Sequence, residues 1–234
     1  AADGRVTYKQ GYVGLVSWGD ASDNTMAIKN LKGTIVEDTE VSAKLNAALK
    51  ENENCLSFNN DAITANDDGT FTSTGFAYKL YNNTLADAFI MTVKVSNPTG
   101  DTAIAGFLFR ARKSTEGDGI DGYLLNFVSN ATNNFIQVYY LKNCYNTTGA
   151  AAVCNYIGGL VLDGTGKTSV NTEITIYVRS NYMTIASGAN ASECFLNDSA
   201  DPTHTAYTSG GGFGVLTWQE NYSATLSILS VKPY

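Results

Sequence analysis

The sequence predicts an all-β protein, a two-sheet antiparallel β-sandwich (jelly roll) with one short helix. Short runs of β-branched and aromatic residues alternate with clusters of Gly, Asn, Asp and Ser, a pattern typical of strands joined by turns. Only 3 of the 234 residues are proline, so most of these runs can pair within sheets. Strands this numerous are typical of sandwiches and jelly rolls, and all-β folds of this length are commonly one domain.

Local patterns place the individual elements. One stretch has helical spacing, because Val41, Leu45 and Leu49 would share one face of a helix over residues 39–49. Asp38 precedes this stretch and can cap the amino end of the helix. The remaining apolar and alternating runs predict strands at 12–18, 25–36, 71–81, 87–96, 103–112, 122–129, 134–142, 155–163, 172–179, 182–187, 213–219 and 224–232.

The two ends of the chain resemble each other. Residues 11–32 align without a gap to residues 211–232, and such self-similarity is typical of tandem architecture. The identical pairs are Gly11/Gly211, Gly14/Gly214, Trp18/Trp218, Thr25/Thr225, Ile28/Ile228 and Lys32/Lys232. We predict that residues 1–32 are a strand segment duplicating the closing strands of a sandwich domain at 33–234. The segment would complete the sheet of its own domain or, by donor-strand exchange, that of a neighbouring molecule.

The composition indicates a globular protein and argues against some partners. Hydrophobic residues make up 44% of the chain and charged residues 16%. The net charge is −7 and no run of Lys or Arg is present, which argues against nucleic acid and anionic membrane surfaces. No apolar run is long enough for a transmembrane helix. The chain begins Ala-Ala-Asp, as proteins do after signal-peptide removal, and we expect it to be secreted, extracellular or on the cell surface.

The four cysteines also favour an oxidising compartment. Cys144 and Cys154 bracket a loop of small residues that a disulfide would close, leaving Cys55 to pair with Cys194, although sequence alone allows three pairings. The spacing fits no zinc pattern, because CxxC is absent and the chain has 1 histidine. Asn-X-Ser/Thr sequons make the chain a candidate glycoprotein, at Asn82, Asn130, Asn146, Asn190, Asn197 and Asn221.

Three of the expected strands pair an aliphatic face with a face of Arg, Gln or Tyr side chains. The second faces carry Arg110 and Arg112, then Gln137 and Tyr139, and last Tyr177 and Arg179. If these strands are neighbours in a curved sheet, the six side chains line a concave surface suited to a sugar, with Trp218 as a further platform. The alternatives are an ordinary solvated sheet face and, for Trp218, a place in the core.

Four segments carry a family likeness: 105–112 (AGFLFRAR), 119–127 (GIDGYLLNF), 135–140 (FIQVYY) and 212–218 (GFGVLTW). In this order they resemble the concanavalin A-like lectin/glucanase superfamily, and within it the laminin-G-like and levan-binding-type carbohydrate-binding modules. The resemblance covers residues 85–234 and its motifs are loose. It implies a jelly roll that is usually secreted and often non-catalytic, with a saccharide or protein ligand and sometimes a calcium ion. The duplicated segment, the helix and the loop between Cys144 and Cys154 depart from the simple module.

Acidic clusters raise the questions of catalysis and of calcium. Residues 116–121 (EGDGID) nearly match the E-x-D-x-x-E strand of retaining glucanases, but their glycines predict a loop. Residues 140–145 (YLKNCY) are similar to a strand of alginate lyases, with a spacing one residue short. Calcium is the candidate cofactor, with Asp118 and Asp121 as its ligands, and oxygen-rich turns also occur at 66–69 and 198–201.

These observations favour a secreted, non-catalytic, lectin-like protein that binds a polysaccharide or glycan in recognition or cell adhesion. One alternative is a structural subunit of an extracellular filament or coat, which would self-associate through residues 11–32. The other is a polysaccharide lyase or hydrolase.

Overall fold

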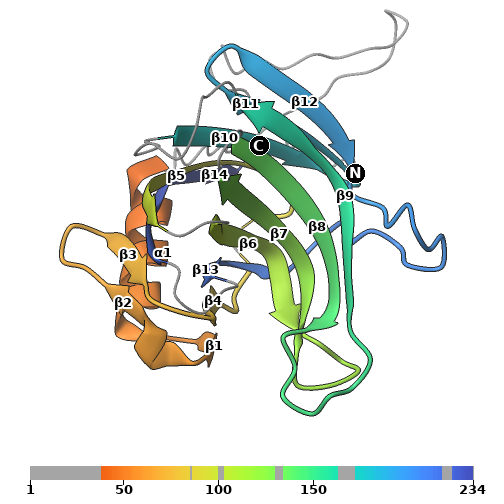
Figure 1. Ribbon diagram of the computed structural model, residues 1–234, viewed down its shortest axis with the longest axis horizontal. Coiled ribbons are helices and arrows are strands. Elements are labelled where there is room, and N and C mark those ends of the chain that lie inside the picture. Colours follow the sequence, from red (N-terminus) through yellow and green to blue (C-terminus); the bar gives the residue numbers. More distant parts are fainter. Residues whose placement is uncertain are drawn as a thin grey trace, which may run out of the picture. The chain divides into compact units, whose positions relative to one another are not determined.

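The computed structural model describes residues 38–84, 86–99, 103–129, 134–162, 172–217 and 223–233. Their strands form two seven-stranded sheets in which all neighbouring strands are antiparallel. The predicted all-β sandwich is therefore confirmed (Figure 1). No helix in these ranges is both long and apolar enough to span a membrane.

The sheet that we call the front sheet has the order β1-β4-β13-β6-β7-β8-β9, and the back sheet has the order β12-β11-β10-β5-β14-β3-β2. The front-sheet strands are β1 (Cys55–Phe58), β4 (Ala77–Tyr81), β13 (Gly212–Thr217), β6 (Ala103–Lys113), β7 (Ile120–Ser129), β8 (Asn134–Cys144) and β9 (Val153–Leu162). The back-sheet strands are β12 (Asn190–Phe195), β11 (Tyr182–Ser187), β10 (Thr172–Arg179), β5 (Phe89–Thr99), β14 (Ser223–Pro233), β3 (Thr70–Ser73) and β2 (Ile63–Ala65).

The main core lies between the sheets and follows from side-chain alternation. Inward-facing residues such as Val93, Val138 and Ile176 are fully buried there. Phe89 of the back sheet packs edge-on against Phe213 of the front sheet, with ring centroids 4.8 Å apart. Burial of this apolar surface is the principal force that holds the two sheets together.

The predicted helix is confirmed as α1 (Asp38–Glu51), and a 3₁₀ turn, η1 (Asn60–Ala62), follows β1. Leu45 and Leu49 of α1 are fully buried in the core between the sheets. The pairing of β14 with β5 shifts register between Ile228 and Ser230. At this irregularity Asn46 donates to the Ile228 carbonyl oxygen (3.1 Å), and the Ser42 hydroxyl accepts from the Val231 amide (2.9 Å). The helix therefore satisfies backbone groups beside the bulge in β14.

The strand predictions hold for most of the described chain, with two kinds of error. The run at 71–81 is not one strand, because a turn at Gly75 divides it into β3 and β4, which lie in different sheets. The short or polar strands β1, β2 and β12 were not predicted. The predicted strands at 12–18 and 25–36 lie outside the described residues.

The closing strands of the chain occupy central places. β13 pairs with β4 and β6, and β14 pairs with β3 and β5. Both strands copied by the duplicated segment are thus already seated in the described sheets. Residues 11–32 lie outside the described part, so self-association through them and the domain boundary at 32/33 stay predictions.

Candidate functional site

The concave surface expected from three alternating strands does not form as predicted. β6 and β8 are separated by β7, and β10 belongs to the back sheet. Gln137 and Tyr139 therefore lie on the outer face of the front sheet, whereas Tyr177 and Arg179 lie on the outer face of the back sheet. Alternation predicts which residues share a face of each strand, but it does not predict the order of the strands in a sheet.

The prediction that Arg110 lies on a ligand-binding face is also wrong. Its backbone is in the left-handed region (φ 47°), and the pairing of β6 with β7 shifts between Phe109 and Arg112. This bulge turns Arg110 inward, where it is 1% exposed. Its guanidinium donates to the carbonyl oxygens of Asp87 (from Nε, 3.2 Å), Tyr207 (2.9 Å) and Ser180. Burial lowers the pKa of Arg110, and the side chain anchors three segments to β6.

Arg112, like Arg110, contacts other residues of the chain. Its guanidinium carbon lies 4.9 Å from the ring centroid of Tyr207, a cation–π contact. Tyr207 stacks on Tyr140 with ring centroids 5.2 Å apart, and Tyr140 stacks on His204 at 5.6 Å. This column of rings holds the loop that leads to β13 against β8.

The outer face of the front sheet contains a polar row across four strands. Register pairs Gly106 with Asn126, Asn126 with Gln137, and Gln137 with Gly159. Directly paired residues share one face, so two amides lie side by side between two glycines that have no side chain. We call these four residues the amide notch.

The amides of the notch have spare hydrogen-bonding capacity. The Asn126 Oδ1 atom is buried and has no hydrogen-bond partner in the described residues. The Gln137 Oε1 atom accepts a hydrogen bond from the Tyr139 hydroxyl (3.1 Å). Burial raises the pKa of Tyr139, so this hydroxyl stays protonated and remains a donor. An unpaired buried acceptor costs about 1–3 kcal/mol, so Asn126 is held in place by its surroundings rather than by its own hydrogen bonds.

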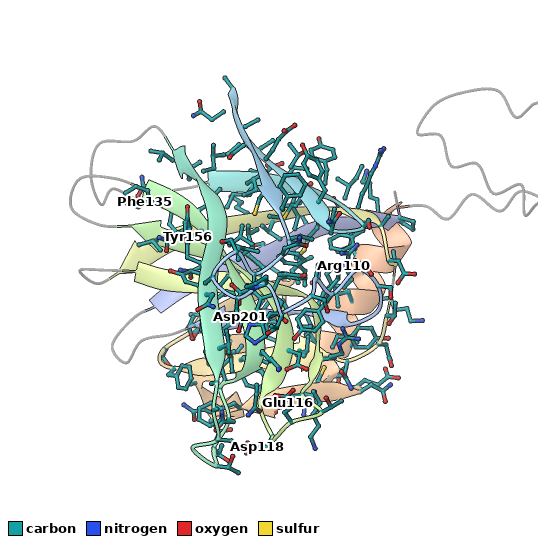
Figure 2. All side chains as sticks on the ribbon, turned by 90° about the vertical axis from the view of Figure 1, so that its right-hand side faces the viewer. Arg110, Glu116, Asp118, Phe135, Tyr156 and Asp201 are labelled. Atoms are coloured by element: carbon teal, nitrogen blue, oxygen red, sulfur yellow. The ribbon has the colours of Figure 1, made fainter. Side chains whose placement is uncertain are left out.

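Aromatic and aliphatic side chains flank the notch on both sides. Tyr156 is 54% exposed and meets Tyr139 edge-on, with ring centroids 6.0 Å apart. On the other side Phe135 pairs with Val161, which is 61% exposed. Figure 2 shows Phe135 and Tyr156 on the same side of β9. The accessible part of this face is thus a strip on β8 and β9 with a polar centre and apolar borders.

The rest of the outer face is apolar and covered. Leu80, Leu108, Leu124 and Leu216 form a second buried cluster there, over which Tyr145 and Tyr78 pack with ring centroids 6.2 Å apart. Among the described outer-face positions of β7, β8 and β9 that flank the notch, none is charged: Leu124, Val128, Phe135, Tyr139, Tyr156 and Val161. The strip therefore offers hydrogen bonds and ring surfaces without ionic partners.

The glycine that ends the notch is expected to tolerate no side chain. A Cβ atom at Gly159 would lie 2.2 Å from the Ile136 carbonyl oxygen, so Gly159→Ala must displace backbone. We expect this change to lower the free energy of unfolding by about 1–3 kcal/mol in urea denaturation. Gly75→Ala is the matched control, because its Cβ atom would meet nothing closer than 3.8 Å. Equal stability of the two variants would contradict the steric argument.

The acidic loop lies away from the notch. Glu116 and Asp118 follow β6 in a loop, as predicted, and Figure 2 shows them far from Phe135 and Tyr156. Asp118 accepts hydrogen bonds from Thr147, and Glu116 pairs with Lys142 (2.9 Å). The Asp121 carboxylate accepts a hydrogen bond from the backbone amide of Asn143 (2.8 Å).

Calcium stays a prediction for this loop. Within the described ranges no cluster of three or more His, Cys, Asp or Glu side chains is arranged to hold a metal ion. The carboxylates of Asp118 and Asp121 are both engaged by protein donors.

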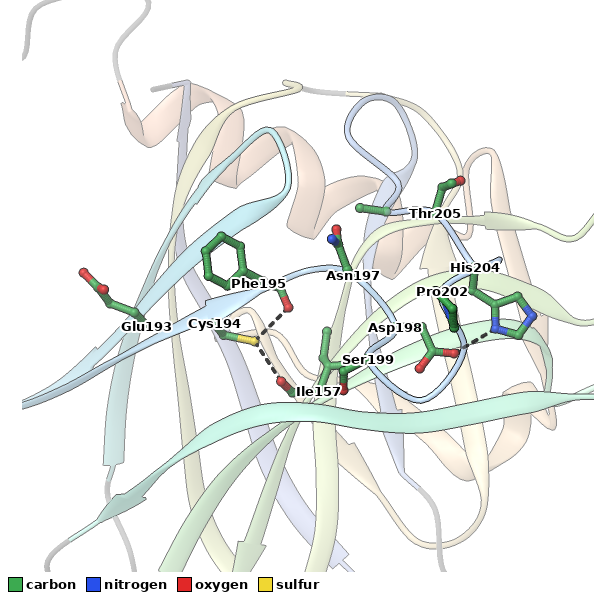
Figure 3. A pocket seen from close by; sticks show the side chains of 11 residues that line it. Ile157, Glu193, Cys194, Phe195, Asn197, Asp198, Ser199, Pro202, His204 and Thr205 are labelled. Atoms are coloured by element: carbon green, nitrogen blue, oxygen red, sulfur yellow. Dashed lines mark hydrogen bonds and ion pairs between the residues drawn. The ribbon is translucent and has the colours of Figure 1, made fainter.

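A pocket of about 680 Å³ lies beside β12 and the loop that follows it (Figure 3). At its wall the His204 Nδ1 atom is 2.8 Å from Asp198 Oδ2, which also accepts from Asn155 (2.9 Å). Burial acts to raise the pKa of Asp198, but hydrogen bonds, that of His204 first, hold it below the ordinary value. Through Asn155, Asp198 joins the loop that follows β12 to β9. No sequence motif contains His204, so the pair could not be predicted from the sequence.

The four cysteines are free thiols in this structure. Cys55 lies in β1 at one edge of the front sheet, whereas the Cys194 thiol contacts the Ile157 carbonyl (3.4 Å) of β9 at the other edge. Five strands separate these edges, on the order of 20–30 Å, whereas disulfide-bonded Cα atoms lie within about 7 Å. The expected pairing of Cys55 with Cys194 is therefore wrong.

The sequons differ in how their amides are used. Asn82 and Asn197 are exposed, and Asn190 is half-buried. The Asn146 amide already donates to the carbonyls of Asn143 (2.8 Å) and Ala150 (3.0 Å). Asn130, Asn221 and Trp218 lie outside the described residues, so their predicted roles stay predictions.

Comparison with known proteins identifies the fold. No protein-family model and no curated protein matches the chain. Among solved structures it is similar to the carbohydrate-binding module CBM66 from Bacillus subtilis, with a TM-score of 0.52 and 13% identity over 76% of this chain and 95% of that one. The fold is that of the concanavalin A-like sandwiches.

Two more distant matches have TM-scores below 0.5. They are a putative glycosyl hydrolase from Parabacteroides distasonis (0.48, 11% identity, 74% of this chain and 83% of that one) and the exoplasmic/lumenal domain of VIP36 (0.44, 12%, 77% and 86%). At these identities the concanavalin A-like match establishes the fold alone, and the site rests on its own geometry.

Proposed function

We propose that this chain is a non-catalytic carbohydrate-binding protein that holds a neutral glycan on the amide notch. In this proposal it acts outside the cell in glycan recognition or adhesion. One observation carries the proposal: two adjacent amides lie between the exposed ring of Tyr156 and the ring of Phe135, among described residues that carry no charge. The likeness to a carbohydrate-binding module agrees with it at the level of the fold.

The chemistry of the strip suits a sugar. An amide both donates and accepts, so Gln137, the half-buried member of the pair, can bond the hydroxyl groups of a sugar, with the buried Asn126 beside it. The exposed ring of Tyr156 can cover the apolar face of a pyranose or furanose ring. Uronate or sulfate groups would find no cation among the described residues of the strip. This favours a neutral glycan over an acidic one.

The same inventory favours binding over catalysis. Most glycoside hydrolases need two carboxyl groups beside the scissile bond. The described residues of the strip supply amides and two tyrosine hydroxyls, those of Tyr139 and Tyr156, and no carboxyl group. Burial raises the pKa of Tyr139, which disfavours it as a base. Glu116 and Asp118, the nearest approach to a glucanase motif, lie on a loop away from it.

Affinity electrophoresis against neutral and acidic polysaccharides tests the proposal. We expect at least one neutral polysaccharide, and no acidic one, to retard the full chain without releasing a product. Gln137→Ala and Tyr156→Ala should each weaken binding about ten-fold, equivalent to about 1.4 kcal/mol, because each removes a hydrogen-bonding group or a ring platform.

Tyr177→Ala is the matched control, since Tyr177 lies on the outer face of the back sheet. It should bind as the unchanged chain does. Weaker binding in Tyr177→Ala, with Gln137→Ala unaffected, would move the ligand to the back sheet and refute the notch as its site.

A further inference from the structure

Two of the four thiols lie side by side where β8 passes into β9. Cys144 ends β8, and Cys154 is the second residue of β9, where it pairs with Leu141. The Cys144 thiol contacts the carbonyl oxygen of Val153 (2.5 Å), the residue before Cys154. Both cysteines belong to the apolar cluster on the outer face of the front sheet. The two sulfur atoms therefore share one site at the base of the loop 145–152.

The backbone and the loop are built to keep this arrangement. Asn143 and Tyr145, on either side of Cys144, are both in the left-handed region (φ 49° and 60°). For a tyrosine this conformation is costly, and it persists only where the surroundings enforce it. The side-chain amide of Asn143 donates to the Ala151 carbonyl (3.1 Å). The backbone amide of Thr147 donates to the Asp118 carboxylate (3.1 Å). These hydrogen bonds hold the two ends of the loop around the pair of thiols.

The two thiols are chemically unequal. Cys144 is 2% exposed, whereas Cys154 is half-buried and thus the more accessible thiol. Hydrogen bonding with Cys144, and then with the Tyr145 hydroxyl, lowers the pKa of Cys154. Hydrogen bonding with Cys154, together with burial, raises the pKa of Cys144. Cys154 is therefore the better nucleophile, and Cys144 is placed to react second.

The other two thiols have no such neighbour. Burial raises the pKa of Cys194 to about 11, and the thiol contacts the carbonyl oxygens of Ile157 (3.4 Å) and Phe195 (3.3 Å). Burial also raises the pKa of Cys55, which contacts the carbonyl of Ala48 (3.4 Å). These two cysteines provide internal controls.

We propose that Cys144 and Cys154 are an oxidisable pair that closes the loop 145–152 with a disulfide, in which Cys154 attacks first and Cys144 resolves. The oxidant is a small-molecule or protein disulfide. Cys55 and Cys194 stay thiols. Because the loop joins the two strands that carry the strip around the amide notch, its closure would fix the edge of that face, but the pairing stands without the glycan proposal.

The reaction balances as two thiol–disulfide exchanges. The Cys154 thiolate attacks one sulfur of oxidised glutathione, forming a mixed disulfide and releasing one glutathione, which takes up a proton. The Cys144 thiolate then attacks the Cys154 sulfur and displaces the second glutathione. Two protein thiols and one glutathione disulfide thus give one protein disulfide and two glutathione molecules, and the protein loses two electrons to the glutathione.

Equilibration of the full chain in graded glutathione redox buffers tests the proposal. After acid quenching and alkylation, trypsin leaves both cysteines in one peptide, residues 143–167. We expect this peptide to lose its alkylation sites together as the buffer becomes more oxidising, while Cys55 and Cys194 remain alkylated. Reduction of the oxidised chain should lower Tm by roughly 5–10 °C, because closing a loop of this length stabilises the fold.

Single variants distinguish the order of attack. Cys144→Ser should accumulate a glutathione mixed disulfide at Cys154, whereas Cys154→Ser should leave Cys144 largely unmodified. Cys55→Ser should oxidise as the unchanged chain does and show the same shift in Tm. Alkylation of all four cysteines at every redox ratio would overturn the pairing, and a mixed disulfide that accumulates only on Cys144 would overturn the order.

Discussion

Replacing Arg110 by alanine is expected to lower the free energy of unfolding by about 3–5 kcal/mol. The guanidinium is buried and donates to carbonyl oxygens of Asp87, Ser180 and Tyr207, which lie on three separate segments. Each buried acceptor left unpaired costs about 1–3 kcal/mol, and the truncated side chain leaves a cavity besides. Urea denaturation followed by tryptophan or tyrosine fluorescence measures the loss.

Two further variants separate anchoring from ligand binding. Arg110→Lys should recover little of the stability, because one ammonium group cannot reproduce the planar fork of a guanidinium. Arg112→Ala should cost only about 0.5–1 kcal/mol, the value of its contact with the Tyr207 ring. If Arg110→Ala instead kept full stability but lost glycan binding, Arg110 would belong to a ligand surface, as alternation alone suggested.

The contrast between β6 and β8 shows how far alternation can be used. On β8, Ile136 and Val138 face the core while Gln137 and Tyr139 face outward, as the sequence predicts. On β6 the same reasoning fails after Phe109, because the bulge moves Ala111 to the outer cluster and turns Arg110 inward. No glycine occupies the bulge on β6 itself, where an arginine has the positive φ and its hydrogen bonds enforce it. The glycines lie opposite, since a Cβ atom at Gly122 or Gly211 would approach the Arg110–Ala111 backbone to within 3 Å.

The notch itself could be predicted only in part. Gln137 and Tyr139 were identified from one strand, but the partners of Gln137, Asn126 and Gly159, come from neighbouring strands through the register. A sequence of strands does not fix which strands become neighbours, since connections can cross from one sheet to the other. Here β5 leads to β6 in the opposite sheet, and β9 is followed by β10 in the opposite sheet.

Loop interactions were the least predictable. The sequence predicts an oxygen-rich turn at 198–201, which contains Asp198, and predicts no role for His204. In the structure Asp198 is 2% exposed, and His204 stacks on Tyr140. The same carboxylate also accepts from Asn155 of β9, a contact between residues far apart in sequence. Local sequence carries no signal for such a meeting.

Removal of the Asp198 carboxylate is expected to have the second-largest effect. Asp198→Ala leaves the donors of His204 and Asn155 and the Ala200 amide without their shared acceptor. We expect the free energy of unfolding at pH 7 to fall by about 2–4 kcal/mol, and the loop before β13 to become accessible to proteolysis. Chemical denaturation and limited proteolysis measure the two effects.

The pH dependence of this loss gives the sharper test. The pKa of Asp198 in the folded chain is lower than its ordinary value of 3.8, so its contribution to stability is complete above that value. The contribution disappears as the pH falls through the lowered pKa, because the carboxylate is then protonated in both states. The stability gap between the unchanged chain and Asp198→Ala should therefore narrow below about pH 4. Asp201→Ala is the matched control, since its carboxylate is exposed and lies 3.7 Å from His204. A gap for Asp198→Ala that stays constant down to pH 2, or one no larger than that of Asp201→Ala at pH 7, would show that the buried carboxylate does not anchor the loop.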